Sequence, residues 1–437
     1  MKRIGYCLLL IVLCFSFVLT GCNGQNSMSE DEGNRVKAAE IEEPTEEVEI
    51  KFWTYNNGWS RIIKSFETIH PKIKINVERF PFEEISKEYK KAVLAGNGPD
   101  ILYLDSGYYY EYTTGEYFED LLKEPYLAGR YEKDFPEDMW ECNKSLNGNR
   151  LISMTFLTSP FVTYYRADIM EENGFPSEPN EFGKFIENPD NLIAIAKKLK
   201  SKGQYIFQMP TDLINLLGSS TGVFDKDLNF VRDSSTFVDM LDLSKKIYQS
   251  QYILGADLWS DIGREAIKND KLVMIITMGS WGTGTIQEIA PEQAGKWRIA
   301  KPPLGLTPWY SDTKLAIDSQ SKNKKWAWLF LEYVVTQQEG GENIDMISGY
   351  LPARKNMKIM LRENVFYGDQ LAQPLFEDLA LNMVQYRQSP LDGKALEIFN
   401  QKILEAIEND IDSKKAIRDI ADEVKRSVEE ERKALLK

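Results

Sequence analysis

Aromatic, carboxylate and amide side chains occur together at the ends of several predicted strands. Ligands bind beyond the carboxyl ends of the strands in open α/β sheets. An aromatic ring can pack against the flat C–H face of a pyranose, while Asp, Asn and Ser side chains bond to its hydroxyls. The pattern therefore favours a binding site for a hydroxyl-rich solute such as a sugar. The residues at these strand ends are Trp53, Tyr55, Asn56, Asn57, Asp105, Ser106 and Trp281.

The first elements that would position these side chains alternate between strand and helix. Residues 48–55 and 73–77 alternate between apolar and polar, which predicts strands. Apolar residues recur at three and four positions over 62–69 and 85–93, which predicts helices. The continuous apolar run 101–104 predicts a strand buried on both faces. This order implies a parallel sheet with right-handed connections.

The same alternation continues through the rest of the chain and defines its class as α/β. The apolar patterns predict further strands over 151–153, 161–165 and 272–277, and helices over 167–173, 191–201, 237–249, 326–337 and, as a pair, 394–436. The last helix is expected to begin at Asp412 and Ser413, which are good N-cap residues. A chain of 437 residues fits about two or three domains.

The N-terminal residues have the features of an export signal. Lys2 and Arg3 precede an apolar run over 4–18, which is short for a membrane span but suits a signal peptide. Residues 19–22 then resemble a bacterial lipobox, so we expect a lipoprotein signal peptide over 1–21 and lipidation, of the palmitate type, at Cys22. The polar and acidic residues 22–47 are expected to be a disordered tether. The predicted location is the extracellular face of the cell membrane, with the membrane contacted through the lipid anchor only.

Charge and residue counts exclude several classes of function. The net charge of −14 becomes −16 when Lys2 and Arg3 are removed, which argues against nucleic acid and disfavours a strongly anionic ligand. Cys142 is the one cysteine beyond the leader and Cys22, and His70, at a predicted helix end, is the one histidine. We therefore expect no metal site, no cofactor and no histidine-based catalytic triad. The chain also lacks the glycine-rich phosphate loop of an ATPase.

The order of these signals resembles the family 1 extracellular solute-binding proteins of ABC transporters, the group that includes maltodextrin-binding proteins. The resemblance covers nearly all of the chain after residue 48. Two departures from the family pattern are Trp309–Thr313, where relatives often have a Gly-Gly pair, and Arg166, where many have asparagine. The resemblance rests on residues 50–53, 66–77, 95–101, 147–176 and 279–281, continued by 321–328 and 349–353.

The resemblance implies a two-lobed periplasmic-binding-protein-like fold of class II, in which each lobe is a mainly parallel sheet flanked by helices. Three hinge crossings are expected near 158–159, 302–304 and 337–340. These place 48–158 with 305–337 in lobe 1, and 160–301 with 341–437 in lobe 2. The implied partners are a sugar, the permease subunits of an ABC importer and a separate ATPase, with the binding protein itself a monomer. Further ligand residues implied by position are Ser159, Trp309, Tyr310, Asp312, Tyr350 and Arg387.

Several assignments keep a second interpretation at the level of sequence. Trp281 is the strongest candidate for stacking against a sugar, whereas Asp105 could instead cap the next helix. Tyr108–Tyr110 and Tyr112 are expected to line a cleft or pack a helix rather than bind iron. The predicted function is capture of a sugar, most simply an oligosaccharide, without catalysis. A surface sensor that presents the ligand to a signalling partner and a surface glycosidase are the alternatives, and the sequence does not specify the sugar.

Overall fold

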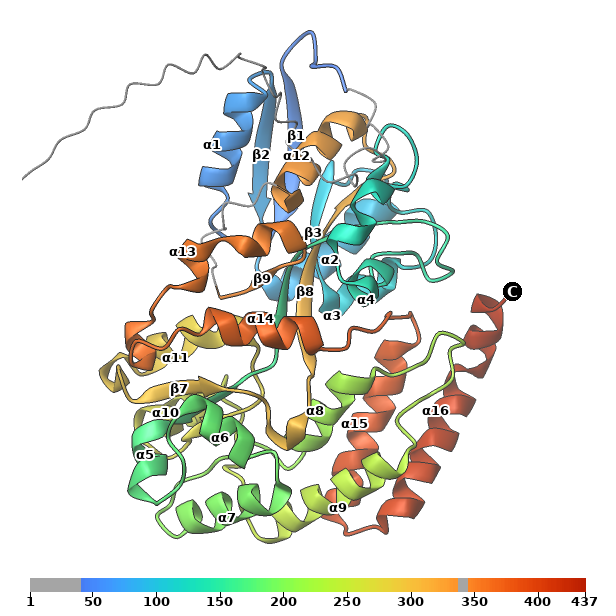
Figure 1. Cartoon of the computed structure of the whole chain (residues 1–437). Coiled ribbons are helices and arrows are strands. Elements are labelled where there is room, and N and C mark those ends of the chain that lie inside the picture. The colour runs from blue at the N-terminus through green and yellow to red at the C-terminus, as the bar shows by residue number, and fades with distance from the viewer. Residues whose placement is uncertain (1–40, 337–344) are drawn as a thin grey trace, which may run out of the picture. The chain divides into compact units, whose positions relative to one another are not determined.

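A computed structural model describes residues 41–336 and 345–437 of the chain (Figure 1). The predicted signal peptide, Cys22, most of the predicted tether and the predicted crossing at 337–340 lie outside the described residues. Within the described part, no helix has the length and apolar character needed to cross a membrane.

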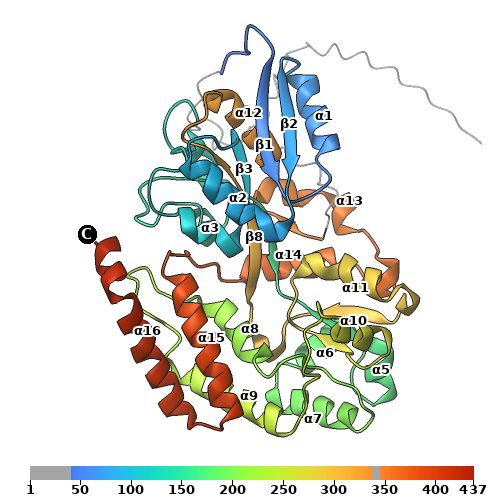
Figure 2. The same ribbon diagram turned by 180° about the vertical axis from the view of Figure 1, so that it is seen from behind.

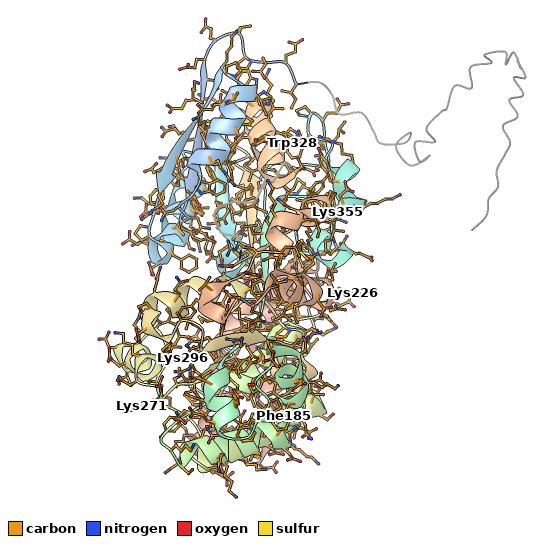
Figure 3. The ribbon with its side chains drawn as sticks, turned by 60° about the vertical axis from the view of Figure 1, so that its left-hand side comes forward. Phe185, Lys226, Lys271, Lys296, Trp328 and Lys355 are labelled. Atoms are coloured by element: carbon orange, nitrogen blue, oxygen red, sulfur yellow. The ribbon has the colours of Figure 1, made fainter. Side chains whose placement is uncertain are left out.

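The first sheet has six strands in the order β2-β1-β3-β8-β4-β9. β1, β2 and β3 run parallel and are joined by helices, as the sequence predicted. Phe66 of α1 and Trp328 of α12 belong to the core on one face, and Tyr89 of α2 belongs to the core on the other. Trp328 is labelled in Figure 3. The elements are β1 (Val48–Thr54), α1 (Ser60–Ile69), β2 (Ile73–Arg79), α2 (Phe82–Leu94), β3 (Ile101–Asp105), β4 (Met154–Pro160), β8 (Trp309–Ile317), α12 (Lys324–Thr336) and β9 (Ile347–Ser348).

The second sheet has three strands in the order β6-β5-β7. Helices lie between its strands in the chain and also follow them. The last two, α15 and α16, lie side by side in both views (Figures 1 and 2). The strands are β5 (Thr163–Arg166), β6 (Met274–Ile275) and β7 (Trp297–Ala300). The remaining helices are α3 (Ser106–Tyr109), α4 (Glu137–Glu141), α5 (Ala167–Glu172), α6 (Pro179–Phe185), α7 (Pro189–Lys200), α8 (Asp212–Thr221), α9 (Ser235–Gln249), α10 (Asp261–Lys268), α11 (Thr283–Ile289), α13 (Met357–Met360), α14 (Gln373–Asn382), α15 (Asp392–Glu408) and α16 (Ser413–Leu435).

The prediction that both sheets are mainly parallel is wrong for the described strands. In the second sheet β5 pairs antiparallel with both β6 and β7. In the first sheet β8 pairs antiparallel with β3 and β4, and β9 pairs antiparallel with β4. Apolar periodicity identifies a strand but not its direction. The direction depends on the end of the sheet at which the chain enters the strand. β8 enters directly from β7 rather than through a crossover helix, and it therefore runs against β3.

Two strand boundaries also differ from prediction because long-range pairing sets them. The strand expected over 151–153 is β4, which begins at Met154 and continues through Pro160; Leu151 forms only an isolated bridge. Trp309–Asp312, part of the first departure from the family pattern, is the start of β8 rather than a loop. Both strands are paired on two edges, and neither set of partners is near in sequence. The pairing of β9 with β4 places residues 347–348 on the first sheet, and the lobe boundaries remain predictions.

A large apolar core joins residues from the middle of the chain to the last two helices. Tyr165 of β5 lies in the same buried cluster as Phe399 of α15 and Val428 of α16. α16 begins as expected, because the Asp412 carboxylate accepts a hydrogen bond from Lys415 N at 2.9 Å. Its apolar residues recur along one face, which buries Ile417 and Val428.

Candidate ligand-binding site

Four aromatic side chains from separate segments contact one another and are here called the aromatic group: Phe161, Trp259, Trp281 and Tyr310. The Tyr310 ring, at the start of β8, has its centroid 4.8 Å from Phe161 and 5.5 Å from Trp281. Trp281 is partly buried and packs against the cores beside both sheets. The sequence predicted Trp281 and Tyr310 for the site, and the structure brings these two together.

Trp259 is a member of this group that the sequence analysis missed. Its ring lies nearly parallel to that of Trp281, with centroids 6.0 Å apart and an interplanar angle of 10°. Trp259 covers one face of Trp281 and is itself 48% exposed. It precedes Ser260, the N-cap of α10, rather than following a strand. The strand-end rule could not find it; a tryptophan directly before a Ser-Asp helix start was the available signal.

The loop that bears Trp259 is held by side-chain hydrogen bonds to its backbone. Gln208 accepts a hydrogen bond from Leu258 N at 2.7 Å through Oε1 and donates from Nε2 to Thr277 Oγ1. The Asp257 carboxylate accepts from Trp259 N at 2.7 Å. These bonds fix the backbone at Leu258 and Trp259, and so they help to position the indole.

Asp105, at the end of β3, forms a second part of the site with residues that follow β1. Its Oδ2 accepts a hydrogen bond from Tyr55 Oη at 3.2 Å, and its Oδ1 accepts from Gly107 N at 2.7 Å. Burial, followed by the nearby Asp312 carboxylate, raises the pKa of Asp105 to about 6. Asn56 Nδ2 donates to Tyr103 Oη at 3.0 Å. Asp105 caps α3 and also stands beside the site, so the two interpretations of this residue are compatible.

Asp312 and Ser106 support the strand end from below the surface. Asp312 is fully buried and pairs with the buried Lys314, whose Nζ lies 2.5 Å from Asp312 Oδ2. Ser106 Oγ accepts a hydrogen bond from Asp312 N at 3.2 Å. The Oδ1 atom of Asp312 has no hydrogen-bond partner among the described residues. The structure therefore places both predicted residues in the packing around β8 rather than on its surface.

A close approach at Gly279 joins the aromatic group to β4. Ser159 Oγ lies 3.0 Å from Ser280 Oγ, and both residues are buried. A Cβ atom at Gly279 would lie 2.4 Å from Ser159 Oγ, 2.9 Å from Tyr310 Cγ and 3.0 Å from Trp281 Cδ1. Glycine is required here because any side chain would displace residues of the site.

Two other predicted residues near β1 have partners away from the aromatic group. Trp53 stacks on Tyr89 of α2, with centroids 6.2 Å apart and an angle of 14°, and also contacts Phe80. Asn57 Oδ1 accepts a hydrogen bond from Arg79. Trp53 therefore packs α2 against the sheet.

Three predicted residues lie in other contacts. Trp309 is buried, with its ring centroid 5.2 Å from Tyr386. The rings closest to Tyr350 are those of Tyr131 and Phe135, and Arg387 donates to Glu141 Oε2 at 2.7 Å and to Leu146 O at 3.1 Å. The structure therefore gives each of these three residues partners outside the aromatic group, although Trp309 directly precedes Tyr310 in β8.

The tyrosines after Asp105 pack a helix, which is one of the two roles expected for them beside lining a cleft. Tyr108, Tyr109 and Tyr112 belong to the buried core on the α2 side of the first sheet. No group of three or more metal-ligating side chains occurs in the described ranges 41–336 and 345–437.

Comparison with known proteins identifies the class that this fold and site define. Residues 61–361 match the family of bacterial extracellular solute-binding proteins, and the chain belongs to that family. It is a family of binding proteins rather than enzymes. The arabinooligosaccharide-binding protein of Bacillus subtilis (strain 168) is 21% identical over 374 residues, which are 81% of each chain.

Solved structures of similar fold cover almost the whole of their own chains. An extracellular solute-binding protein of family 1 aligns with a TM-score of 0.74 and 18% identity over 86% of this chain and 99% of that chain. The sugar-binding protein MalE of Xanthomonas citri aligns with a TM-score of 0.71 and 16% identity over 89% and 100%. The galacto-N-biose-/lacto-N-biose I-binding protein of Bifidobacterium longum gives 0.71 and 17% over 89% and 98%. The fold is therefore the α/β fold of periplasmic binding proteins.

Proposed function

We propose that this protein is the substrate-binding lipoprotein of an ABC importer and that it captures a sugar, preferably an oligosaccharide. The aromatic group is the observation that carries the proposal. Its rings reach from β8 to the loop before α10, where Trp259 is about half exposed and lies beside the exposed carboxylate of Asp257. Rings with an adjacent carboxylate bind a pyranose through its C–H face and its hydroxyls together.

The names of related proteins support a sugar as the ligand. The Bacillus subtilis relative is named for arabino-oligosaccharides, and the Bifidobacterium longum structure contains lacto-N-biose. An arabino-oligosaccharide is therefore a reasonable first probe. The ligands named for these two relatives contain more than one sugar ring, which favours a ligand of more than one ring here.

In the proposed mechanism, the two predicted lobes close around the ligand and the importer recognises the closed form. Ligand shifts this equilibrium only by its difference in affinity for the two states. Contacts of Trp281 with the cores beside both sheets would make that difference sensitive to the bound sugar. Translocation and ATP hydrolysis belong to separate permease and ATPase subunits, while lipidated Cys22 keeps the binding protein at the extracellular face of the membrane.

A thermal-shift screen of residues 28–437 against a sugar library tests the proposal. A ligand that binds only the folded state raises the melting temperature, by an amount that grows with its concentration. Trp281→Ala should remove most of the shift produced by the best sugar. Trp326→Ala is the matched control. Trp326 of α12 is also partly exposed, but its Nε1 donates a hydrogen bond to Glu42 O, and its contacts are separate from the aromatic group.

Two outcomes would contradict the proposal in different ways. If no sugar shifts the melting temperature, the ligand class is wrong. If Trp281→Ala retains the full shift, the site is wrong although the class stands. Deleting the gene and measuring uptake of the identified sugar then separates transport from the sensor alternative, since a sensor leaves uptake unchanged.

A further inference from the structure

We infer that this site discriminates by charge, binding neutral and amino sugars and rejecting sugars that carry a carboxylate. The inference rests on the proposed function and adds the chemical class of the ligand. It follows from two carboxylates, Asp105 and Asp257, that lie near the aromatic group.

Two carboxylates lie near Tyr310: Asp105 at the end of β3 and Asp257 in the loop before α10. The Asp257 carboxylate accepts a hydrogen bond from Trp259 N at 2.7 Å, which places it beside a ring of the aromatic group. After burial, these two carboxylates are the groups that raise the pKa of Tyr310 to about 12, which requires both to lie near its hydroxyl. Asp257 is exposed and Asp105 is partly exposed, so both can act on a ligand that contacts the ring.

The nearby positive charge does not offset them. Lys314 is buried, and its Nζ is already engaged by Asp312 at 2.5 Å. Arg79, at the end of β2, donates to Asn57. In the described part of the chain, none of the lysine or arginine groups that lie over aromatic rings lies over a ring of the aromatic group.

A uronic acid placed on these rings would therefore meet two like charges. Binding proteins that accept carboxylates normally supply a bidentate arginine or a lysine for them. A neutral sugar instead offers hydroxyl donors to Asp105 and Asp257, and an amino sugar offers an ammonium group. The order of affinity should be amino sugar equal to or above neutral sugar, with the uronate about tenfold or more below it.

Matched oligosaccharides test this directly. Titration calorimetry with the chain 28–437 would compare trimers of galactose and galacturonic acid, and trimers of N-acetylglucosamine and glucosamine, at pH 7.5 and low salt. We expect each neutral or amino member to bind at least about tenfold more tightly than an acidic trimer, and the ratio to fall with added salt. An acidic trimer that binds as tightly as its neutral counterpart overturns the inference.

Substitutions locate the source of the discrimination. Asp257→Asn and Asp105→Asn should each reduce the neutral-to-acidic ratio several-fold, and exposed Asp257 can be replaced with little risk to folding. Asp239→Asn on α9 is the control, because it removes an exposed charge on another helix and should leave the ratio unchanged. A ratio unaffected by both site variants overturns the inference while the proposed function stands. Failure of every sugar to bind, whatever its charge, sinks the proposed function first.

Discussion

Replacing Gly279 with alanine should disturb the candidate site. The added Cβ would lie 2.4 Å from Ser159 Oγ and 2.9 Å from Tyr310 Cγ, which is below normal contact distance. The backbone of Gly279 has φ −80° and ψ 178°, which alanine adopts without strain, so the effect isolates the collision. Overpacking of this kind costs about 1–3 kcal/mol. Ser159 is fully buried, and the colliding atom of Tyr310 is Cγ, which joins the ring to the rest of the side chain. Neither residue can therefore move away freely.

The assay is urea unfolding followed by tryptophan fluorescence, with sugar affinity measured in parallel. Gly279→Ala should lower the free energy of unfolding by that amount and weaken sugar binding, because Tyr310 and Trp281 both move. Gly284→Ala is the matched control: no atom lies within 4 Å of its new Cβ, and alanine within α11 should be neutral or stabilise by about 0.5–1 kcal/mol. Equal stability and affinity in the two variants would refute the packing described around Gly279.

Three further predictions concern buried ionisable groups. Burial raises the pKa of Asp212 to about 7, so ionisation of this carboxyl opposes folding. The free energy of unfolding should therefore fall by about 3 kcal/mol as pH rises from 5 to 8. Asp212→Asn, measured by urea midpoints, should lose this dependence, and parallel pH profiles of the two proteins would contradict the prediction. Lys314→Met should destabilise the protein by about 3–5 kcal/mol because it leaves Asp312 charged and unpaired. Adding Asp312→Leu should restore much of the lost stability. A double variant no more stable than the single one would contradict the ion pair between Lys314 and Asp312. Cys142 is buried and its pKa is raised to about 12 by burial, so a thiol reagent should modify it only after unfolding, and rapid labelling of the native protein would disprove its burial.

Sequence patterns were sufficient where a signal is local. The alternation in β1 and β2 and the apolar run of β3 predicted these strands, their parallel direction and the N-cap of α16. The direction of β8 and the extent of β4 were not predictable, because both depend on pairing with strands far along the chain.

The same distinction applies to the candidate site. Trp281 and Asp105 were found because each follows a predicted strand. Trp259 was missed because its position beside Trp281 is created by the loop that Gln208 holds, and neither residue marks that contact in the sequence. Tyr350 and Arg387 were expected nearby from resemblance alone, and the structure gives them other partners.

The buried cluster that joins Tyr165 to Val428 has a consequence for synthesis of the chain. While the ribosome is still adding α15 and α16, the apolar residues of β5, α7 and α9 have no completed cover, and closing so long a loop is entropically slow. The nascent chain consequently exposes apolar surface until its last helix emerges, and we expect chaperones that bind unfolded chains to recognise it. A chain that stopped before α16 would keep that surface open permanently and should be degraded rather than accumulate.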